Sequence, residues 1–248
     1  HLDQALAMAK IAIEDGITDI ICTPHHLNGV YQNDASSILS ACHQLQGALD
    51  DQQLPLTVHP GAENHLVPEL LDGLRAGSVM TMAHRGRYLL VELPVMSIPM
   101  GTEQVLKSLL KQGLTPIIAH PERNDALRLD PTRLGEWVDW GVLGQVTAQS
   151  LTGQFGPLVQ QAAWHMTEQG WIHCVASDAH RDKRRIPIIS PAHQAISERL
   201  GLEFANWLVD AVPRAVLLGQ AIDRVDHDDQ ITKAQSHYTR RPWWRRWF

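Results

Sequence analysis

The sequence has 248 residues, of which 44% are hydrophobic, and this is enough apolar material for one large domain with a buried core. Lysine and arginine number 21 against 27 acidic residues, and the resulting formal net charge of −6 argues against a nucleic-acid-binding protein. The 3 cysteines form no paired motif, so no disulfide framework is predicted. No apolar run reaches roughly 18 residues, so no membrane span is predicted either. The cytoplasm is therefore the expected compartment.

The first part of the chain alternates apolar stretches of helical spacing with short β-branched runs. Glycine, proline or asparagine clusters separate these stretches. The predicted elements are a helix at 2–15, a strand at 17–23, a helix from Asp34 or Ser36 to about 51, a strand at 56–59, a helix at 67–75 and a strand at 88–91.

The same alternation continues to residue 222. The predicted elements are helices at 102–112, 133–140, 158–168, 191–200, 203–210 and 213–218, and strands at 115–119, at 143–147 and from 171 onwards. This regular order indicates an α/β protein with a parallel, closed or nearly closed sheet. Six strands are predicted and the sequence begins on a helix, so a strand before residue 1 would make seven.

The last 26 residues differ in composition from the rest. Residues 223–230 are acidic and polar, whereas 238–248 hold four arginines and three tryptophans. We expect residues 1–222 to form the domain and 223–248 to be a mobile tail. Tryptophan among arginines suits a membrane headgroup region or an acidic partner, and a disordered tail is the alternative.

Imidazoles and carboxylates follow the ends of five predicted strands. These residues are His25 and His26, Glu63, Glu92, His120, and Asp178 with His180. In α/β barrels the carboxyl ends of the strands face one mouth, so we expect these side chains to converge. Such ligands suit Mn, Fe or Zn, and paired metals can clamp the attacking and leaving oxygens of a displacement at phosphorus. One such residue alone is more often an ordinary loop residue, but five strand ends together predict a metal site.

The other histidines are predicted to have no ligand role. Four are assigned to the core, strands or loops (His59, His65, His84 and His173), and five to the surface and helices (His43, His165, His193, His227 and His237).

Basic residues lie beside the predicted ligands. Arg123 follows His120 by three residues, and the basic run 181–185 follows His180 directly. Guanidinium groups bind phosphate oxygens in a bidentate manner, so these residues favour a phosphate ester as substrate. For the run 181–185 a solvated loop is the alternative.

Taken together, these motifs resemble a known superfamily. They are Thr-Pro-His-His at 23–26, Gly-Ala-Glu at 61–63, Glu92, Ala-His-Pro-Glu-Arg at 119–123 and Ala-Ser-Asp-Ala-His at 176–180. In this order and spacing they resemble the PHP (polymerase and histidinol phosphatase) superfamily. Within it, the chain is most similar to the bacterial manganese-dependent protein tyrosine phosphatases encoded with capsule and exopolysaccharide genes. The resemblance covers about residues 1–222.

The resemblance implies a distorted (β/α)7 barrel of the PHP type with up to three metal ions, taken as Mn with Fe or Zn as alternatives. The implied metal ligands are His25, Glu63, Glu92, His120, Asp178 and His180. The implied phosphate-binding residues are Arg123 and Arg185, with Arg184 as an alternative to Arg185. The implied reaction is hydrolysis of phosphotyrosine in proteins by a hydroxide that bridges the metals. The implied partner is a bacterial tyrosine kinase of polysaccharide export, met at the inner face of the membrane.

One part of the family pattern is missing from the sequence. The family opens with a strand that carries a His-x-His pair, and we expect this strand to precede residue 1 in the natural protein. Two alternatives stay open. One is a small-molecule phosphomonoesterase similar to histidinol phosphatase, and the other is a non-catalytic module that binds phosphotyrosine.

Overall fold

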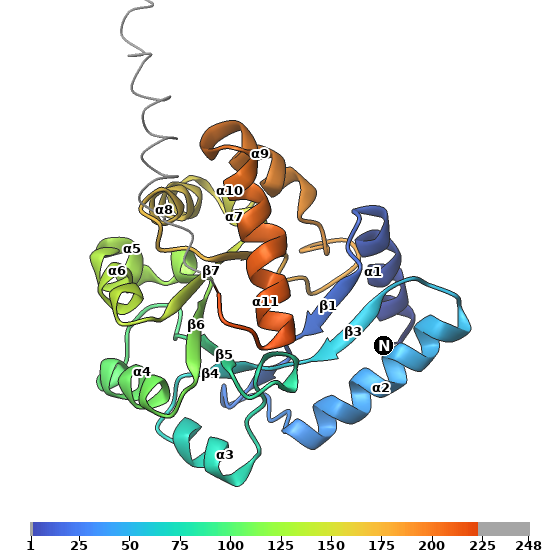
Figure 1. Ribbon diagram of the computed structural model, residues 1–248, viewed down its shortest axis with the longest axis horizontal. Coiled ribbons are helices and arrows are strands. Elements are labelled where there is room, and N and C mark those ends of the chain that lie inside the picture. Colours follow the sequence, from blue (N-terminus) through green and yellow to red (C-terminus); the bar gives the residue numbers. More distant parts are fainter. Residues whose placement is uncertain (1, 223–248) are drawn as a thin grey trace, which may run out of the picture.

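The computed structural model describes residues 2–222, and these form a six-stranded and a two-stranded parallel sheet with helices packed around them (Figure 1). The predicted tail at 223–248, including the proposed membrane contact through 238–248, lies outside the described residues. Within residues 2–222, none of the helices combines the length and the apolar character that are needed to span a bilayer.

Two of the predicted strands, at 17–23 and 56–59, are each followed by a bend and by a short second strand that was not predicted. β1 (Asp19–Cys22) is followed two residues later by β2 (His25–His26), and β3 (Thr57–Pro60) is followed likewise by β4 (Glu63–His65). β1 pairs with β3 and β2 with β4, both in parallel, so the two bent strands remain neighbours on each side of the bend. Gly61 lies at this bend, where an added Cβ would be 2.7 Å from the side chain of Ile21. A larger residue would therefore push the strands apart.

β1 and β3 form a two-stranded sheet of their own, whereas β2 and β4 belong to a larger sheet. The four further strands of the larger sheet are β5 (Tyr88–Glu92), β6 (Thr115–Ala119), β7 (Leu143–Thr147) and β8 (Cys174–Ala176). The six-stranded sheet has the order β2-β4-β5-β6-β7-β8, and all of its pairings are parallel. The order follows the chain, which confirms the predicted α/β fold with a parallel sheet. β2 and β8 are the two edges of this sheet.

Most predicted helices are present. They are α1 (Leu2–Glu14), α2 (Ala35–Asp51), α3 (Leu70–Ala76), α4 (Thr102–Lys111), α6 (Thr132–Asp139), α8 (Pro157–Glu168), α9 (Ser190–Leu200) and α11 (Val212–Leu218). Asp34, not Ser36, caps α2, because its carboxylate accepts a hydrogen bond from the backbone N–H of Ser37 at 2.8 Å. The predicted helix at 203–210 consists of α10 (Leu202–Asn206) and a π-helical turn, η3 (Trp207–Ala211).

Four short helical segments were not expected from the sequence: η1 (Met82–His84), η2 (Pro121–Arg123), α5 (Asp125–Leu129) and α7 (Ala148–Leu151). Each is three to five residues long, which is too short for helical periodicity to stand out. Two of them, η2 and α7, lie directly after the strands β6 and β7 and so belong to the carboxyl edge of the sheet.

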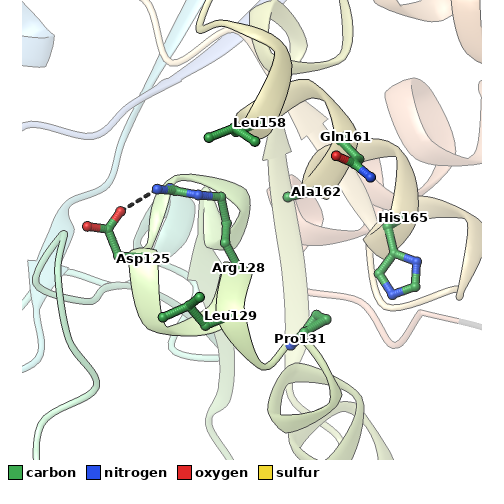
Figure 2. Close-up of a pocket in the computed structure, with 8 residues that line it drawn as sticks. All are labelled: Asp125, Arg128, Leu129, Pro131, Leu158, Gln161, Ala162 and His165. Atoms are coloured by element: carbon green, nitrogen blue, oxygen red, sulfur yellow. Dashed lines mark hydrogen bonds and ion pairs between the residues drawn. The ribbon is translucent and has the colours of Figure 1, made fainter.

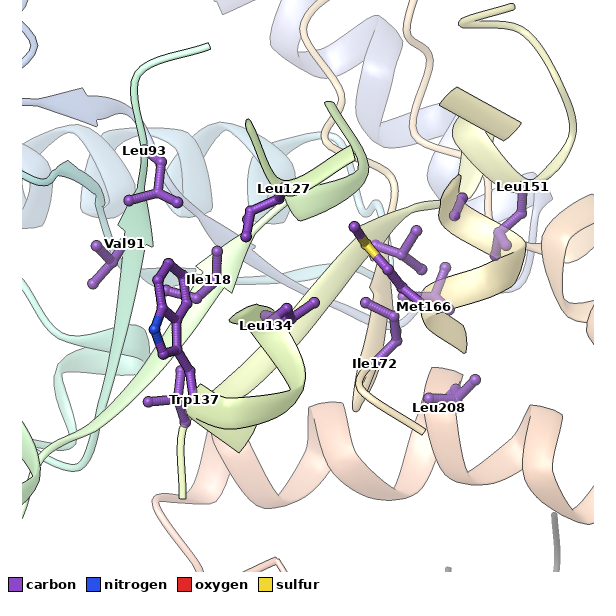
Figure 3. Close-up of a cluster of buried hydrophobic side chains, with 14 of the residues drawn as sticks. Val91, Leu93, Ile118, Leu127, Leu134, Trp137, Leu151, Met166, Ile172 and Leu208 are labelled. Atoms are coloured by element: carbon purple, nitrogen blue, oxygen red, sulfur yellow. The ribbon is translucent and has the colours of Figure 1, made fainter. Parts of the chain in front are cut away.

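Both faces of the six-stranded sheet are buried, and the side chains along each strand alternate between the two faces. One face packs against α4, α6 and α8 and contributes Val91 and Ile118 to the larger core, which also contains the fully buried Trp137 (Figure 3). On the other face, Leu90 and Ile117 pack with Val212 and Val216 of α11 and the neighbouring residues. With both faces covered, polar side chains gather at the carboxyl ends of the strands.

Candidate metal and phosphate site

A cluster of two histidines and two glutamates lies on the neighbouring strands β2, β4 and β5 and directly after β6. His25 is in β2, Glu63 begins β4, Glu92 ends β5 and His120 follows β6. The register pairs His25 with Glu63 directly, so the backbone brings these two residues together. His25 Nδ1 lies 2.8 Å from Glu63 Oε2 and 3.4 Å from Glu92 Oε2. His120 Nε2 lies 3.0 Å from Glu63 Oε1 and 3.6 Å from Glu92 Oε1.

Burial and the neighbouring charges determine the protonation of this cluster. Glu63 is only 5% exposed, and this burial opposes ionisation, but the hydrogen bonds with His120 and His25 outweigh it and lower the pKa of Glu63 to about 2. For Glu92 too, the hydrogen bonds with His25 and His65 outweigh the effect of burial, and its pKa lies below the usual range. The two carboxylates in turn raise the pKa of His25 to about 10.

The donor set of this cluster fits a divalent cation. One donor atom from each of His25, Glu63 and Glu92 lies within 4.8 Å of the others, as in a shared coordination site. Two carboxylates held side by side and largely buried repel each other and need positive charge to offset them. Imidazole nitrogen and carboxylate oxygen together suit Mn, Fe or Zn, and thiolate is absent from the three donors.

Metal binding at this cluster is expected to release protons. Because the pKa of His25 is about 10, its imidazole is protonated at pH 7 and must lose that proton before nitrogen can bind a metal. Calorimetric titration with MnCl₂ at pH 7, in buffers of different ionisation enthalpy, should give a release of about one proton or more per ion. Affinity should also fall as the pH is lowered from 8 to 6. Binding without proton release would mean that His25 is not a ligand.

In a second group of side chains, two arginines donate hydrogen bonds to one carboxylate. Arg123, at the end of η2, donates from Nη1 to Asp178 Oδ2 at 2.6 Å, and Arg185 donates from Nη2 to the same oxygen. Both Asp178 and Arg185 have left-handed backbone conformations, with φ of 48° and 53°. Such conformations cost free energy in residues other than glycine and are concentrated at functional sites. Two guanidinium groups that converge on one point can bind the oxygens of a phosphate.

His180 lies between the two groups. Its Nδ1 is 3.0 Å from the backbone oxygen of Asp178, and its ring centre is 6.0 Å from that of His25. The structure therefore brings all the predicted ligands and both predicted arginines to one region. Arg184, the alternative to Arg185, is exposed to solvent.

Three neighbours of the site were not predicted as site residues, and the side chain of one candidate, His26, makes no hydrogen bond to the cluster. His65 lies 3.4 Å from Glu92 Oε2, and its position two residues after Glu63 in β4 places it on the same side of the strand. The ring of Tyr31 stacks on His25, with centres 6.1 Å apart, and Phe155 lies against the two arginines. His26 is buried, and both its ring nitrogens have no hydrogen-bond partner among the described residues.

A buried carboxyl group fixes the turn that carries Arg123. Glu122 is fully buried, and its Oε1 accepts hydrogen bonds from the backbone N–H of Thr147 at 3.0 Å and from Ser150 Oγ at 2.6 Å. Burial raises the pKa of Glu122. This residue joins η2 to α7, so the ends of β6 and β7 are held together.

Replacing Ser150 with alanine should weaken this link. The loss of one buried hydrogen bond to a carboxyl group is expected to lower the free energy of unfolding by about 1.5–3 kcal/mol. Urea denaturation followed by circular dichroism would measure the change. Thr152→Ala is the matched control, because Thr152 makes only a long 3.4 Å bond to the carbonyl of Ala148 and another to that of Gln149. Equal stability of the two variants would show that the Ser150 bond contributes little.

A separate cavity of about 490 Å³ lies on the outer surface, between α5 and α8 (Figure 2). It is lined by Asp125, Arg128, Leu129, Pro131, Leu158, Gln161, Ala162 and His165. None of the predicted ligands is among these residues, so the cavity is distinct from the polar site. Arg128 pairs with Asp125 and also donates a hydrogen bond to the backbone oxygen of Arg123 at 2.9 Å. It therefore links the wall of the cavity to the turn η2, which carries Arg123.

The chain is similar in sequence to a known protein family and to proteins of known activity. Residues 1–218 match the family described as capsular polysaccharide synthesis, CpsB/CapC. The chain is 35% identical over 206 residues to the tyrosine-protein phosphatase YwqE of Bacillus subtilis, which covers 83% of this chain and 81% of the relative. It is 25% identical over 225 residues to the tyrosine-protein phosphatase CpsB of Streptococcus pneumoniae, covering 89% and 92% of the two chains.

A solved structure is also similar. It comes from crystal structures of YwqE from Bacillus subtilis and CpsB from Streptococcus pneumoniae, described as unique metal-dependent tyrosine phosphatases. The TM-score is 0.86 at 34% sequence identity, and the alignment covers 89% of each chain. The arrangement of helices and parallel strands is therefore shared with that structure.

Proposed function

The chain belongs to the CpsB/CapC family of capsular polysaccharide synthesis, and we therefore propose that it is a metal-dependent phosphatase that hydrolyses phosphotyrosine in proteins. The observation that carries the proposal is the position of the histidine–glutamate cluster beside two convergent arginines. The cluster suits divalent metal ions and the arginines suit phosphate, so together they fit a phosphate monoester.

The proposed metal ligands are His25, Glu63, Glu92 and His120, with Asp178 and His180 serving a further ion. Up to three ions are proposed, with Mn first and Fe or Zn as alternatives. When bound, such ions lower the pKa of water towards 7 and act as Lewis acids at a phosphoryl oxygen. Glu63 contacts both histidines of the cluster through its two different oxygens, and this position supports a bridging role.

The proposed role of Arg123 and Arg185 is to hold the phosphoryl group. Their guanidinium groups donate hydrogen bonds to its non-bridging oxygens and stabilise the charge that develops there during displacement. Asp178 keeps the two groups together, since both donate to its Oδ2. The leaving group is a phenolate, and because the pKa of tyrosine is about 10, it leaves more readily than an alkoxide does. The site therefore has less need of a general acid.

The extent of the domain, the type of barrel and the identity of the substrate are part of the same proposal. We propose that residues 1–222 form the phosphatase domain and that the sheet is a distorted seven-stranded barrel of the PHP type. The parallel strands that follow one another in chain order support it. The substrate that we propose is a tyrosine kinase of polysaccharide export, and the family's description as capsular polysaccharide synthesis supports this choice.

Comparing two substrates would test the proposal. Initial rates should be measured with MnCl₂ on a phosphotyrosine peptide and on histidinol phosphate, with EDTA as the control. We expect Mn-dependent hydrolysis, a preference for the phosphotyrosine peptide and loss of activity in EDTA. A preference for histidinol phosphate would instead indicate a small-molecule phosphatase. Tight binding of the phosphopeptide with no turnover would indicate a binding module.

A further inference from the structure

An aromatic ring lies beneath both proposed phosphate-binding arginines. The guanidinium carbon of Arg123 lies over the ring of Phe155, 5.0 Å from its centre, and that of Arg185 lies 5.7 Å from the same centre. Both distances are within the roughly 6 Å at which a cation is attracted to the face of an aromatic ring. Arg123 comes from η2 and Arg185 from the loop before α9, so Phe155 is a shared contact of two distant segments.

The loop that carries Phe155 is tightly built. It connects α7 to α8, and Gly153 and Gly156 adopt positive φ values of 86° and 90° on either side of the ring. The N–H of Gly156 donates to the carbonyl of Gly153 at 3.0 Å, which closes the turn. Gln160 of α8 donates to the backbone oxygen of Leu151 at 2.9 Å and so joins the two ends of the loop. Residue 155 is therefore presented by a constrained turn, and its ring is half-buried.

The charges of the two arginines are not balanced by Asp178 alone. Arg123 and Arg185 carry two positive charges, and both donate to the single oxygen Oδ2 of one carboxylate. Like charges held together repel, and the negative face of an aromatic ring offsets part of this repulsion without neutralising either charge. A second carboxylate would offset it more strongly but would repel phosphate.

We infer that Phe155 is a positioning residue that holds Arg123 and Arg185 in the convergent geometry needed to bind a phosphate group. The inference rests on the proposed function and extends it to a residue outside the predicted motifs. An aromatic ring is the required feature, because an aliphatic side chain of similar volume fills the space but has no negative face.

The test is a comparison of Phe155→Leu with Phe155→Tyr. We expect the leucine variant to raise KM for p-nitrophenyl phosphate and the inhibition constant of inorganic phosphate by about five- to tenfold, with a smaller change in kcat. The tyrosine variant should restore both constants to near the wild-type values. Trp140→Leu is the control, because it removes another contact between a cation and an aromatic ring, that of Lys107 in α4 with Trp140, the residue that follows α6.

Two results would overturn the inference. One is an unchanged inhibition constant for inorganic phosphate in Phe155→Leu, with KM raised only for the aryl ester, because the ring would then act on the substrate directly and not through the arginines. The other is equal impairment of the tyrosine and leucine variants. Calorimetry with inorganic phosphate keeps the test separate from the proposed function. If the wild type binds phosphate more tightly than Phe155→Leu but hydrolyses no phosphotyrosine, the function fails and the inference stands.

Discussion

Replacing Glu63 with glutamine is expected to lower kcat for Mn-dependent hydrolysis of a phosphotyrosine peptide by at least about a hundredfold. Loss of a residue that only supports a metal ligand typically costs about 10- to 100-fold in metal affinity or activity, and Glu63 is proposed as a ligand itself. The amide is similar in size to the carboxylate but carries no charge. It therefore leaves His25 and His120 without the carboxylate oxygens that lie 2.8 and 3.0 Å from them.

The matched control for Glu63→Gln is Asp19→Asn. Asp19 also pairs with a histidine, since its Oδ1 lies 2.9 Å from Nε2 of His59, but this pair is at the amino end of β1, away from the cluster. The hydrolysis rate should fall only for Glu63→Gln. The amount of bound Mn, measured by inductively coupled plasma mass spectrometry, should also fall only for this variant. Retained turnover in that variant would exclude a bridging role for Glu63.

Replacing Arg185 with glutamine is expected to lower kcat by about 10²- to 10³-fold, which is the usual cost of removing one donor that stabilises developing charge. Glutamine keeps a hydrogen-bond donor but loses the positive charge and the planar fork of the guanidinium group. Metal bound at the cluster of His25, Glu63, Glu92 and His120 should stay close to that of the wild type, because the hydrogen bond and the ring contact of Arg185 are with Asp178 and Phe155, outside that cluster.

Arg184→Gln provides the control for Arg185→Gln within the same loop. Arg184 is exposed and Arg185 is half-buried, so the two variants remove the same charge from adjacent positions that differ in their contacts. Steady-state kinetics of both variants would assign the phosphate-binding role. A larger loss of activity in Arg184→Gln would assign it to the neighbouring residue.

The parallel sheet could be predicted because its physical signal is local. Each strand is a short apolar run, and the helices between strands have helical spacing and are ended by glycines such as Gly113 and Gly141. The two bends between β1 and β2 and between β3 and β4 were not predicted. They depend on close packing of Gly61 against the neighbouring strand, and periodicity carries no information about such packing.

The site residues that lie at strand ends could be predicted, like the sheet itself, from the sequence. Because parallel strands share one carboxyl edge, residues at strand ends such as His25, Glu63 and His120 could be expected to meet. The sequence patterns predict no ligand role for His65, although its spacing of two residues from Glu63 places both side chains on the same side of the strand. Phe155 had no such signal. It reaches the site from the loop between α7 and α8, and only folding brings that loop to the arginines.

An anomalous difference map from crystals soaked in MnCl₂, recorded at the Mn absorption edge, would test the metal site most directly. We expect a peak within coordination distance of Glu63 and in contact with His25, Glu92 or His120. The absence of anomalous density from this cluster, with Mn bound elsewhere on the molecule, would contradict the proposed metal-dependent chemistry.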